Sequence, residues 1–303
     1  MTALQASLKD HLHLHFIVLI WGFTAILGLV ITIPPVELVF FRTFIAGLGL
    51  GAMLFLRGQD FRLPTPEMGK LLATGLLIAA HWILFFGAAR VANASVCLAG
   101  MATSSLWTSI LEPLMAGKRI RLLEIGIGLV VLVGLYTIFH FEFNHALGVI
   151  MAVGSAMLAA LFSVLNSRFS RRHHAFVITF YEMVGAFLGT AVFLPFYAIW
   201  VAKGGQLHLN PTGKDWLCIA VLGLVCTVYA YSAAVKLLQN FSVFAMNLTI
   251  NLEPVYGIIL AFLIFRQTEK MTPGFYLGTL IILLAVLSYP ALNRLTSRAV
   301  PAK

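Results

Sequence analysis

The chain has 303 residues, of which 60% are hydrophobic and only 10% are charged, and its mean hydropathy is +0.96. A soluble domain carries about 25% charged residues, so this composition excludes an ordinary water-soluble fold and predicts an all-α membrane protein. The formal net charge of +9 does not indicate nucleic-acid binding, because no basic patch is interleaved with the aromatic platforms that such binding uses.

Ten apolar segments follow one another along the chain, each close to the length of about 20 residues that a helix needs to cross a bilayer. The predicted transmembrane helices are residues 14–33, 36–56, 68–89, 94–116, 122–139, 146–166, 175–200, 216–235, 243–265 and 273–292. The loops between them are short, so we expect no soluble domain outside the bilayer. The first segment continues without the cleavage site of a signal peptide, so we expect it to be retained as an anchor.

The basic residues are distributed unequally between the two sides that ten spans define. Loops on the side of the termini carry most of them, including Arg57, Arg62, Arg171 and Arg172. Because basic loops tend to stay in the cytoplasm, the sequence predicts a multi-pass protein of the cell inner membrane with both termini cytoplasmic.

Two short patterns recur in the two halves of the chain. The second predicted helix contains Phe40-Phe41-Arg42 and the seventh contains Phe180-Tyr181-Glu182, and spaced glycines follow each triplet. The recurrence predicts two five-helix repeats, residues 1–142 and 143–303. Because five is odd, the second repeat enters the bilayer from the opposite face, so the repeats are predicted to be inverted.

The ninth predicted helix carries a carboxylate, Glu253, next to Pro254 in the middle of its apolar run. Such a residue costs on the order of 3 kcal/mol to insert and usually marks a pathway. We therefore expect Glu253 to be a protonatable or cation-binding group. The alternative is structural: Pro254 bends the helix and the carboxylate caps a neighbouring one.

Other polar and aromatic residues within the spans are candidates for binding a solute. His81 and Trp82 lie in the third helix with Phe85 on nearly the same face as His81, and histidine in lipid is rare enough to suggest a cavity wall. Further candidates for hydrogen bonds to a solute are Asn166, Tyr229, Tyr231, Asn247 and Asn251. Hydrogen bonds between helices explain these last five residues equally well.

Three charged residues within or near the spans are expected to have structural roles. Arg42 is predicted to bind helix-end carbonyls or to snorkel outward, and Glu182 to serve packing, with a gate as the alternative for each. Glu112 is predicted to be an interfacial charge partner near Lys118 and Arg119.

Three motifs resemble the signatures of the EamA family in the drug/metabolite transporter superfamily. They are Trp21-Gly22-Phe23-Thr24, Pro35-Val36-Glu37-Leu38-Val39-Phe40-Phe41-Arg42 and Asn251-Leu252-Glu253-Pro254-Val255. The resemblance implies two inverted five-helix repeats and a central cavity lined mainly by helices one, three, four, six, eight and nine. It adds Trp21 and Thr24 to the substrate-binding candidates. One departure is Thr103-Ser104-Ser105, which stands where a counterpart of Glu253-Pro254 is expected, so the two half-sites are predicted to be chemically unequal.

The sequence thus predicts a secondary active transporter that exports a small metabolite, amino-acid-like or aromatic, by alternating access. A flippase of a lipid or lipid-linked sugar is one alternative. A membrane-embedded enzyme is a weaker one, because the chain has no His-Glu-x-x-His, Gly-x-Ser-x-Gly or phosphate-binding Gly-x4-Gly-Lys motif. We expect no catalytic residues, metal or cofactor.

The expected partners are a small-molecule substrate and the lipid bilayer. Small residues that favour close helix packing occur in the fifth and tenth helices: Gly126, Gly128, Gly134, Gly274 and Gly278. They fit packing within one chain or in a homodimer, so the sequence leaves both monomer and dimer open.

Overall fold

The computed structural model describes residues 6–117, 119, 121–141, 145–265 and 272–298, and these residues form helices and loops without any strand. In chain order the helices are α1 (Leu8–Gly22), α2 (Thr24–Val30), α3 (Pro35–Leu56), α4 (Thr65–Val91), α5 (Ala94–Met101), α6 (Ser104–Ala116), α7 (Leu122–Phe141), α8 (Ala146–Phe169), α9 (Ala175–Trp200), a 3-10 turn η2 (Lys203–Gly205), α10 (Gly213–Ala220), a π-helical segment η3 (Val221–Tyr229), α11 (Ala230–Leu237), α12 (Val243–Ile250), α13 (Glu253–Phe265) and α14 (Pro273–Arg298). Every predicted apolar segment is therefore helical, apart from short breaks.

Seven of the described helices, with consecutive segments counted together, are long and apolar enough to cross a membrane. They are Leu8–Val30, Pro35–Leu56, Thr65–Val91, Ala94–Ala116, Ala146–Phe169, Ala175–Trp200 and Gly213–Leu237. The remaining three predicted spans, around α7, α12 with α13, and α14, fall short of this criterion within the described residues. The chain is thus a multi-pass helical membrane protein.

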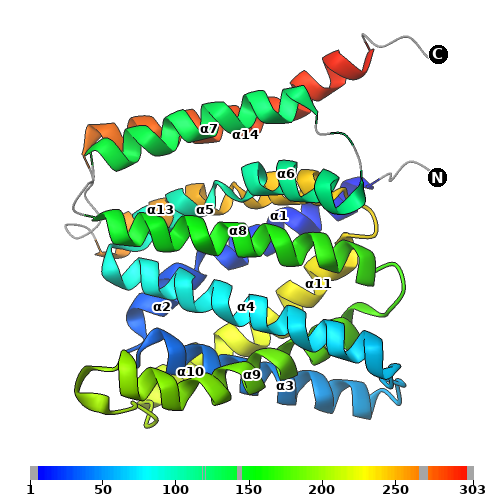
Figure 1. Cartoon of the computed structure of the whole chain (residues 1–303), viewed down its shortest axis with the longest axis vertical. Helices are drawn as coiled ribbons and strands as arrows, with labels where there is room; N and C mark the ends of the chain where they lie inside the picture. The colour runs from blue at the N-terminus through cyan, green and yellow to red at the C-terminus, as the bar shows by residue number, and fades with distance from the viewer. Residues whose placement is uncertain (1–5, 118, 120, 142–144, 266–271, 299–303) are drawn as a thin grey trace.

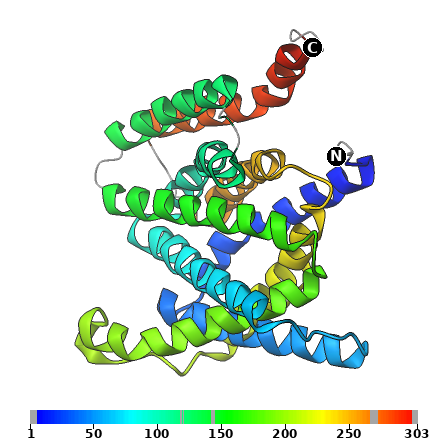
Figure 2. The ribbon, with the colours of Figure 1, turned by 45° about the vertical axis from the view of Figure 1, so that its right-hand side comes forward.

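The long helices lie side by side in one bundle (Figure 1). The beginning of α1 and the end of α14 lie at the same end of this bundle, which we call the terminal end. The opposite end, where α2 finishes and α3 begins, is the far end. α7 and α14 pack together along one edge, and α3 and α9 pack together along the opposite edge, as the turned view also shows (Figure 2).

Three predicted spans are divided by a break in the helix. The first divides α1 from α2 at Phe23, where Thr24 Oγ1 donates a hydrogen bond to the carbonyl of Trp21 at 2.7 Å. The second divides α5 from α6, where Thr103 Oγ1 donates to the carbonyl of Gly100 at 2.8 Å. The third divides α12 from α13, where Pro254 has no N–H with which to continue the helical ladder.

The helix contacts are reciprocal between the two halves of the chain. α3 packs on η3 and α9 packs on α4, whereas α1 packs on α12 and α13 and α8 packs on α5 and α6. In the first two contacts, the second helix of one half packs on the third helix of the other half. In the last two, the first helix of one half packs on the fourth helix of the other.

Glycines bring the backbones of α4 and α9 together at the level of Glu182. A Cβ added to Gly75 would lie 2.2 Å from Glu182 O, and one added to Gly185 would lie 2.2 Å from Leu72 O. These positions therefore require glycine, and they hold Glu182 in the protein interior. Gly134 is likewise packed against Gly278 O and Ile282 of α14, a contact within one chain.

Candidate substrate cavity

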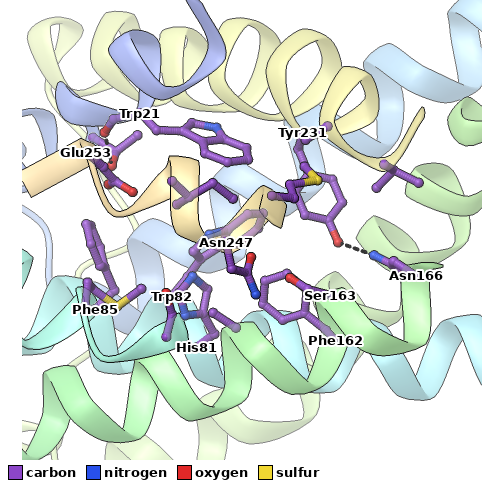
Figure 3. Close-up of a pocket in the computed structure, with 18 of the residues that line it drawn as sticks. Trp21, His81, Trp82, Phe85, Phe162, Ser163, Asn166, Tyr231, Asn247 and Glu253 are labelled. Atoms are coloured by element: carbon purple, nitrogen blue, oxygen red, sulfur yellow. Dashed lines mark hydrogen bonds between the residues drawn. The ribbon is translucent and has the colours of Figure 1, made fainter. Parts of the chain in front are cut away.

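A cavity of about 100 Å³ lies inside the bundle, between the helices that Figure 3 draws. The predicted site residues that line it are Trp21, Thr24, Arg42, His81, Trp82, Phe85, Asn166, Tyr231, Asn247 and Glu253. Side chains from both halves of the chain thus meet in one hollow. Glu253 and Trp21 lie at one end of it, and Tyr231 and Asn166 lie at the other.

The break between α1 and α2 lets α13 approach the cavity. A Cβ on Gly22 would lie 3.2 Å from the Cβ of Tyr256 and 3.4 Å from the backbone nitrogen of Gly257. Trp21, also in α1, turns its indole inward and donates from Nε1 to the carbonyl of Cys226 at 3.1 Å. The Trp21-Gly22-Phe23-Thr24 motif therefore contributes both a close helix contact, through Gly22, and cavity-lining residues, Trp21 and Thr24.

The breaks in the two halves meet each other beside the cavity. Ser104 Oγ donates to Asn251 Oδ1 at 3.0 Å, and Asn247 Nδ2 donates to Thr108 Oγ1 at 2.7 Å. Asn247 lines the cavity, whereas Asn251 is buried behind it. Asn251 thus connects helices, which was one of its two predicted roles. Ser104 lines the cavity without having been predicted as a single site residue.

Arg42 corrects one prediction: its side chain does not snorkel outward. It is 2% exposed to solvent, and its guanidinium carbon lies 3.7 Å from the centroid of the Trp82 ring. The electron-rich ring face partly replaces water around the cation. Among the described residues the guanidinium donates one hydrogen bond, from Nε to Thr227 Oγ1 at 3.0 Å. Its terminal amino groups are therefore available to a ligand.

Glu253 presents its carboxylate to the same cavity. It accepts no hydrogen bond from any residue that the structure describes, although it begins α13 and is only 7% exposed. Arg42 lines the same cavity, yet no described ion pair or hydrogen bond joins the two side chains. The cavity therefore holds one cation and one carboxylate that do not neutralise each other directly.

His81 is fixed by α8 and turns one ring nitrogen away from that helix. Its Nδ1 lies 2.9 Å from the carbonyl oxygen of Ser155, and the Ser155 hydroxyl lies 2.9 Å from the carbonyl oxygen of His81. Because a carbonyl only accepts, Nδ1 carries the hydrogen, which leaves Nε2 of the neutral ring as an acceptor. Phe162 packs edge-on against His81, with 5.3 Å between ring centroids.

A polar cluster stands at the Tyr231 end of the cavity. The Tyr231 hydroxyl donates to Glu182 Oε2 at 3.1 Å. Its oxygen accepts a hydrogen bond from Asn166 Nδ2 at 2.8 Å (Figure 3). Tyr231 and Asn166 line the cavity, whereas Glu182 lies behind them and is fully buried.

The π-helical segment η3 was not predicted. Its wider turn lets Thr227 Oγ1 donate to the carbonyl of Leu222, five residues earlier, and the same hydroxyl oxygen accepts from Arg42. It also brings Cys226 to the cavity wall. Such segments often occur at functional sites, but apolar periodicity gives no signal for one extra residue in a turn. Phe162 and Ser163 also line the cavity and were not predicted.

Two residues singled out from the sequence lie away from the cavity. Tyr229 is 42% exposed, and its hydroxyl lies 3.1 Å from His13 Nε2. Glu112 accepts a hydrogen bond from the backbone N–H of Phe244 at 3.1 Å and so caps the beginning of α12. Lys118, one of its expected partners, lies outside the described residues.

Comparison with known proteins identifies a family of transporters. The profile of the EamA-like transporter family matches residues 12–140 and 146–289. The chain therefore belongs to the EamA-like transporter family, and this membership points to transport rather than to an enzyme.

The individual relatives have low sequence identity to this chain. The chain is 28% identical to the pseudopaline exporter CntI of Pseudomonas aeruginosa over 199 residues, which cover 64% of this chain and 65% of the exporter, less than two thirds of its length. It is 25% identical to an uncharacterized transporter of Archaeoglobus fulgidus over 276 residues, which cover 88% of this chain and 92% of that one. A solved crystal structure with 17% identity shares the fold at a TM-score of 0.69, covering 94% of this chain and 99% of the other.

Proposed function

We propose that this protein is a secondary transporter that exports a small zwitterionic solute, amino-acid-like and carrying an apolar or aromatic part. The observation that carries the proposal is the pair of unneutralised charges in the cavity, Arg42 and Glu253. A guanidinium with free amino groups suits a carboxylate, and an unpaired carboxylate suits an amine. Trp21, Trp82 and Phe85 supply aromatic faces for the apolar part.

Alternating access is the transport mechanism that the arrangement supports best. The reciprocal helix contacts between the two halves, and the separate family matches to each half, support two five-helix repeats over residues 1–142 and 143–303. Ten spans make these repeats inverted, so two equivalent packings open the cavity to opposite sides. The exporter relative and the basic loops support export across the cell inner membrane with both termini cytoplasmic.

Counterflow in proteoliposomes tests this function with three related probes. Radiolabelled phenylalanine carries both charges, phenethylamine lacks the carboxylate, and 3-phenylpropionate lacks the amine. We expect exchange of phenylalanine and weaker exchange of both analogues. Turnover of a labelled lipid without exchange of phenylalanine would instead support a flippase and contradict the proposal.

Two substitutions test whether Glu253 binds the amine of the solute and Arg42 binds its carboxylate. Glu253→Gln is expected to weaken competition by phenylalanine and phenethylamine about tenfold or more, since a hydrogen bond to a charged group contributes about 1.5–3 kcal/mol, and to spare 3-phenylpropionate. Arg42→Gln is expected to weaken competition by phenylalanine and 3-phenylpropionate and to spare phenethylamine. If Glu253→Gln keeps the affinity for all three probes, Glu253 does not bind the amine.

A further inference from the structure

Tyr231 is a hydrogen-bonded link between the cavity and a carboxyl group that the cavity does not reach. Glu182 is 0% exposed, and its Oε2 lies 3.1 Å from the Tyr231 hydroxyl oxygen. Asn166 bonds the same oxygen from the cavity side at 2.8 Å. The role of this cluster does not follow from binding a zwitterion at Arg42 and Glu253.

The cluster contains two buried acceptor atoms without a donor among the described residues, Glu182 Oε1 and Asn166 Oδ1. Both belong to side chains that bond the one tyrosine hydroxyl. Buried polar atoms are normally paired, and an exception needs an explanation. A group that binds and releases a hydrogen here would explain it.

No described cation bonds Glu182. The charged or titratable residues on the elements packed against α9 are Glu37 and Arg42 on α3, Glu67, Lys70, His81 and Arg90 on α4, Tyr231 and Lys236 on α11, and Lys203 on η2. Only Tyr231 among those described bonds Glu182. Lys70 pairs with Glu67, Arg42 with Thr227 and Trp82, and His81 with Ser155. With no described cation bonded to it, the Glu182 carboxylate can be neutralised by a proton.

We propose that Glu182 is the proton site of the carrier and that Tyr231 reports its protonation state to the cavity, an inference that rests on the proposed function. With Glu182 ionised, the Tyr231 hydrogen points at the carboxylate, and the Tyr231 oxygen, which accepts one hydrogen bond from Asn166, offers its second lone pair to a donor on the solute. With a proton on Glu182, the carboxyl O–H donates to the Tyr231 oxygen and the tyrosine hydrogen turns into the cavity.

Protonation thus changes this end of the cavity from an acceptor to a donor. An amine-bearing solute binds better when Glu182 is ionised and is released when a proton binds. One proton enters as one solute leaves, no proton passes to the solute, and the coupling is proton antiport.

A pH gradient across proteoliposomes tests the coupling, with phenylalanine as the probe. An acidic lumen is expected to accumulate phenylalanine severalfold through the wild-type protein. Glu182→Gln, which keeps the size and an acceptor for Tyr231, is expected to abolish accumulation while counterflow at equal pH persists. Accumulation by Glu182→Gln at the wild-type level, or accumulation into an alkaline lumen by the wild type, would overturn the inference.

Two more variants keep the test decisive if Glu182→Gln does not fold. Tyr231→Phe removes only the hydroxyl link. In the pH gradient, the ratio of phenylalanine concentration inside the vesicles to that outside is expected to fall to one while counterflow persists. A ratio as high as that of the wild-type protein overturns the inference. Tyr181→Phe is the matched control, because that hydroxyl donates to the carbonyl of Phe61 outside the cavity. Absence of phenylalanine counterflow in the wild-type protein overturns the proposed function itself, and the coupling with it.

Discussion

The two ends of the bundle join equivalent elements with different chemistry. At the far end, Asp215 is the third residue of α10, and its carboxylate accepts hydrogen bonds from the N–H and the hydroxyl of Thr32, both at 2.7 Å, just after α2. At the terminal end, Glu67 is the third residue of α4, and its Oε2 lies 3.3 Å from Nε2 of His173, just after α8. Each joint connects the first helix of one half with the third helix of the other.

A second pair of contacts follows the same pattern. At the far end Arg90 donates to the carbonyls of Gly28 at 3.2 Å and Ile31 at 2.6 Å, and at the terminal end Gln239 Nε2 donates to the carbonyl of Ser170 at 2.5 Å. The far end thus uses a carboxylate and a guanidinium, whereas the terminal end uses a carboxylate with an imidazole and a neutral amide. Two ends with corresponding helix contacts are therefore held together by different chemistry.

The largest effect is expected from breaking the far joint with Asp215→Ala. Two hydrogen bonds to a carboxylate are lost, each worth about 1.5–3 kcal/mol, so the packing that opens the far end should gain tenfold or more in population. Cys226 lines the cavity and serves as the reporter once Cys97 and Cys218 are replaced by alanine. Alkylation of Cys226 by an impermeant maleimide from the far side should rise by that factor.

The control for Asp215→Ala is Asp10→Ala. Asp10 makes the same capping box with Ser7 at the beginning of α1, as Asp215 does with Thr212, but it does not bond α2. Loss of a cap alone therefore leaves far-side alkylation unchanged. Equal alkylation in the two variants would show that the Asp215 contact with Thr32 does not close the far end.

The sequence was sufficient to predict the helices and ten of the 21 residues that line the cavity, because apolar length and polar residues inside a span are local signals. It did not reveal η3, since an extra residue in one turn leaves composition unchanged. Tyr229 and Tyr231 were both expected in the site, yet residues two apart point to different sides of a helix, and only Tyr231 lines the cavity. The joints at Thr32 and His173 link distant segments, which no pattern in a single sequence shows.

A smaller effect is expected from Arg90→Met at the same far end. The variant keeps an apolar stem and removes the donor to the carbonyls of Gly28 and Ile31, but Arg90 is only partly buried, so water can take the place of its guanidinium. Far-side alkylation of Cys226 should rise severalfold, less than for Asp215→Ala. Arg57→Met is the control, because Arg57 lies over the Phe176 ring at the terminal end. An effect of Arg90→Met as large as that of Asp215→Ala would contradict this ranking.

The smallest effect is expected from breaking the terminal joint with His173→Ala. The contact between His173 Nε2 and Glu67 Oε2 is 3.3 Å long and joins side chains that are 17% and 19% exposed, so solvent screens it and its loss should shift the populations only a few fold. Alkylation of Cys226 from the terminal side should therefore rise a few fold in His173→Ala, less than the far-side effect of Arg90→Met. The neighbouring His174 caps α9 through the N–H of Phe176, so His174→Ala is the control and should keep the wild-type rate. An equal rise in both variants would show that the contact between His173 and Glu67 does not close the terminal end.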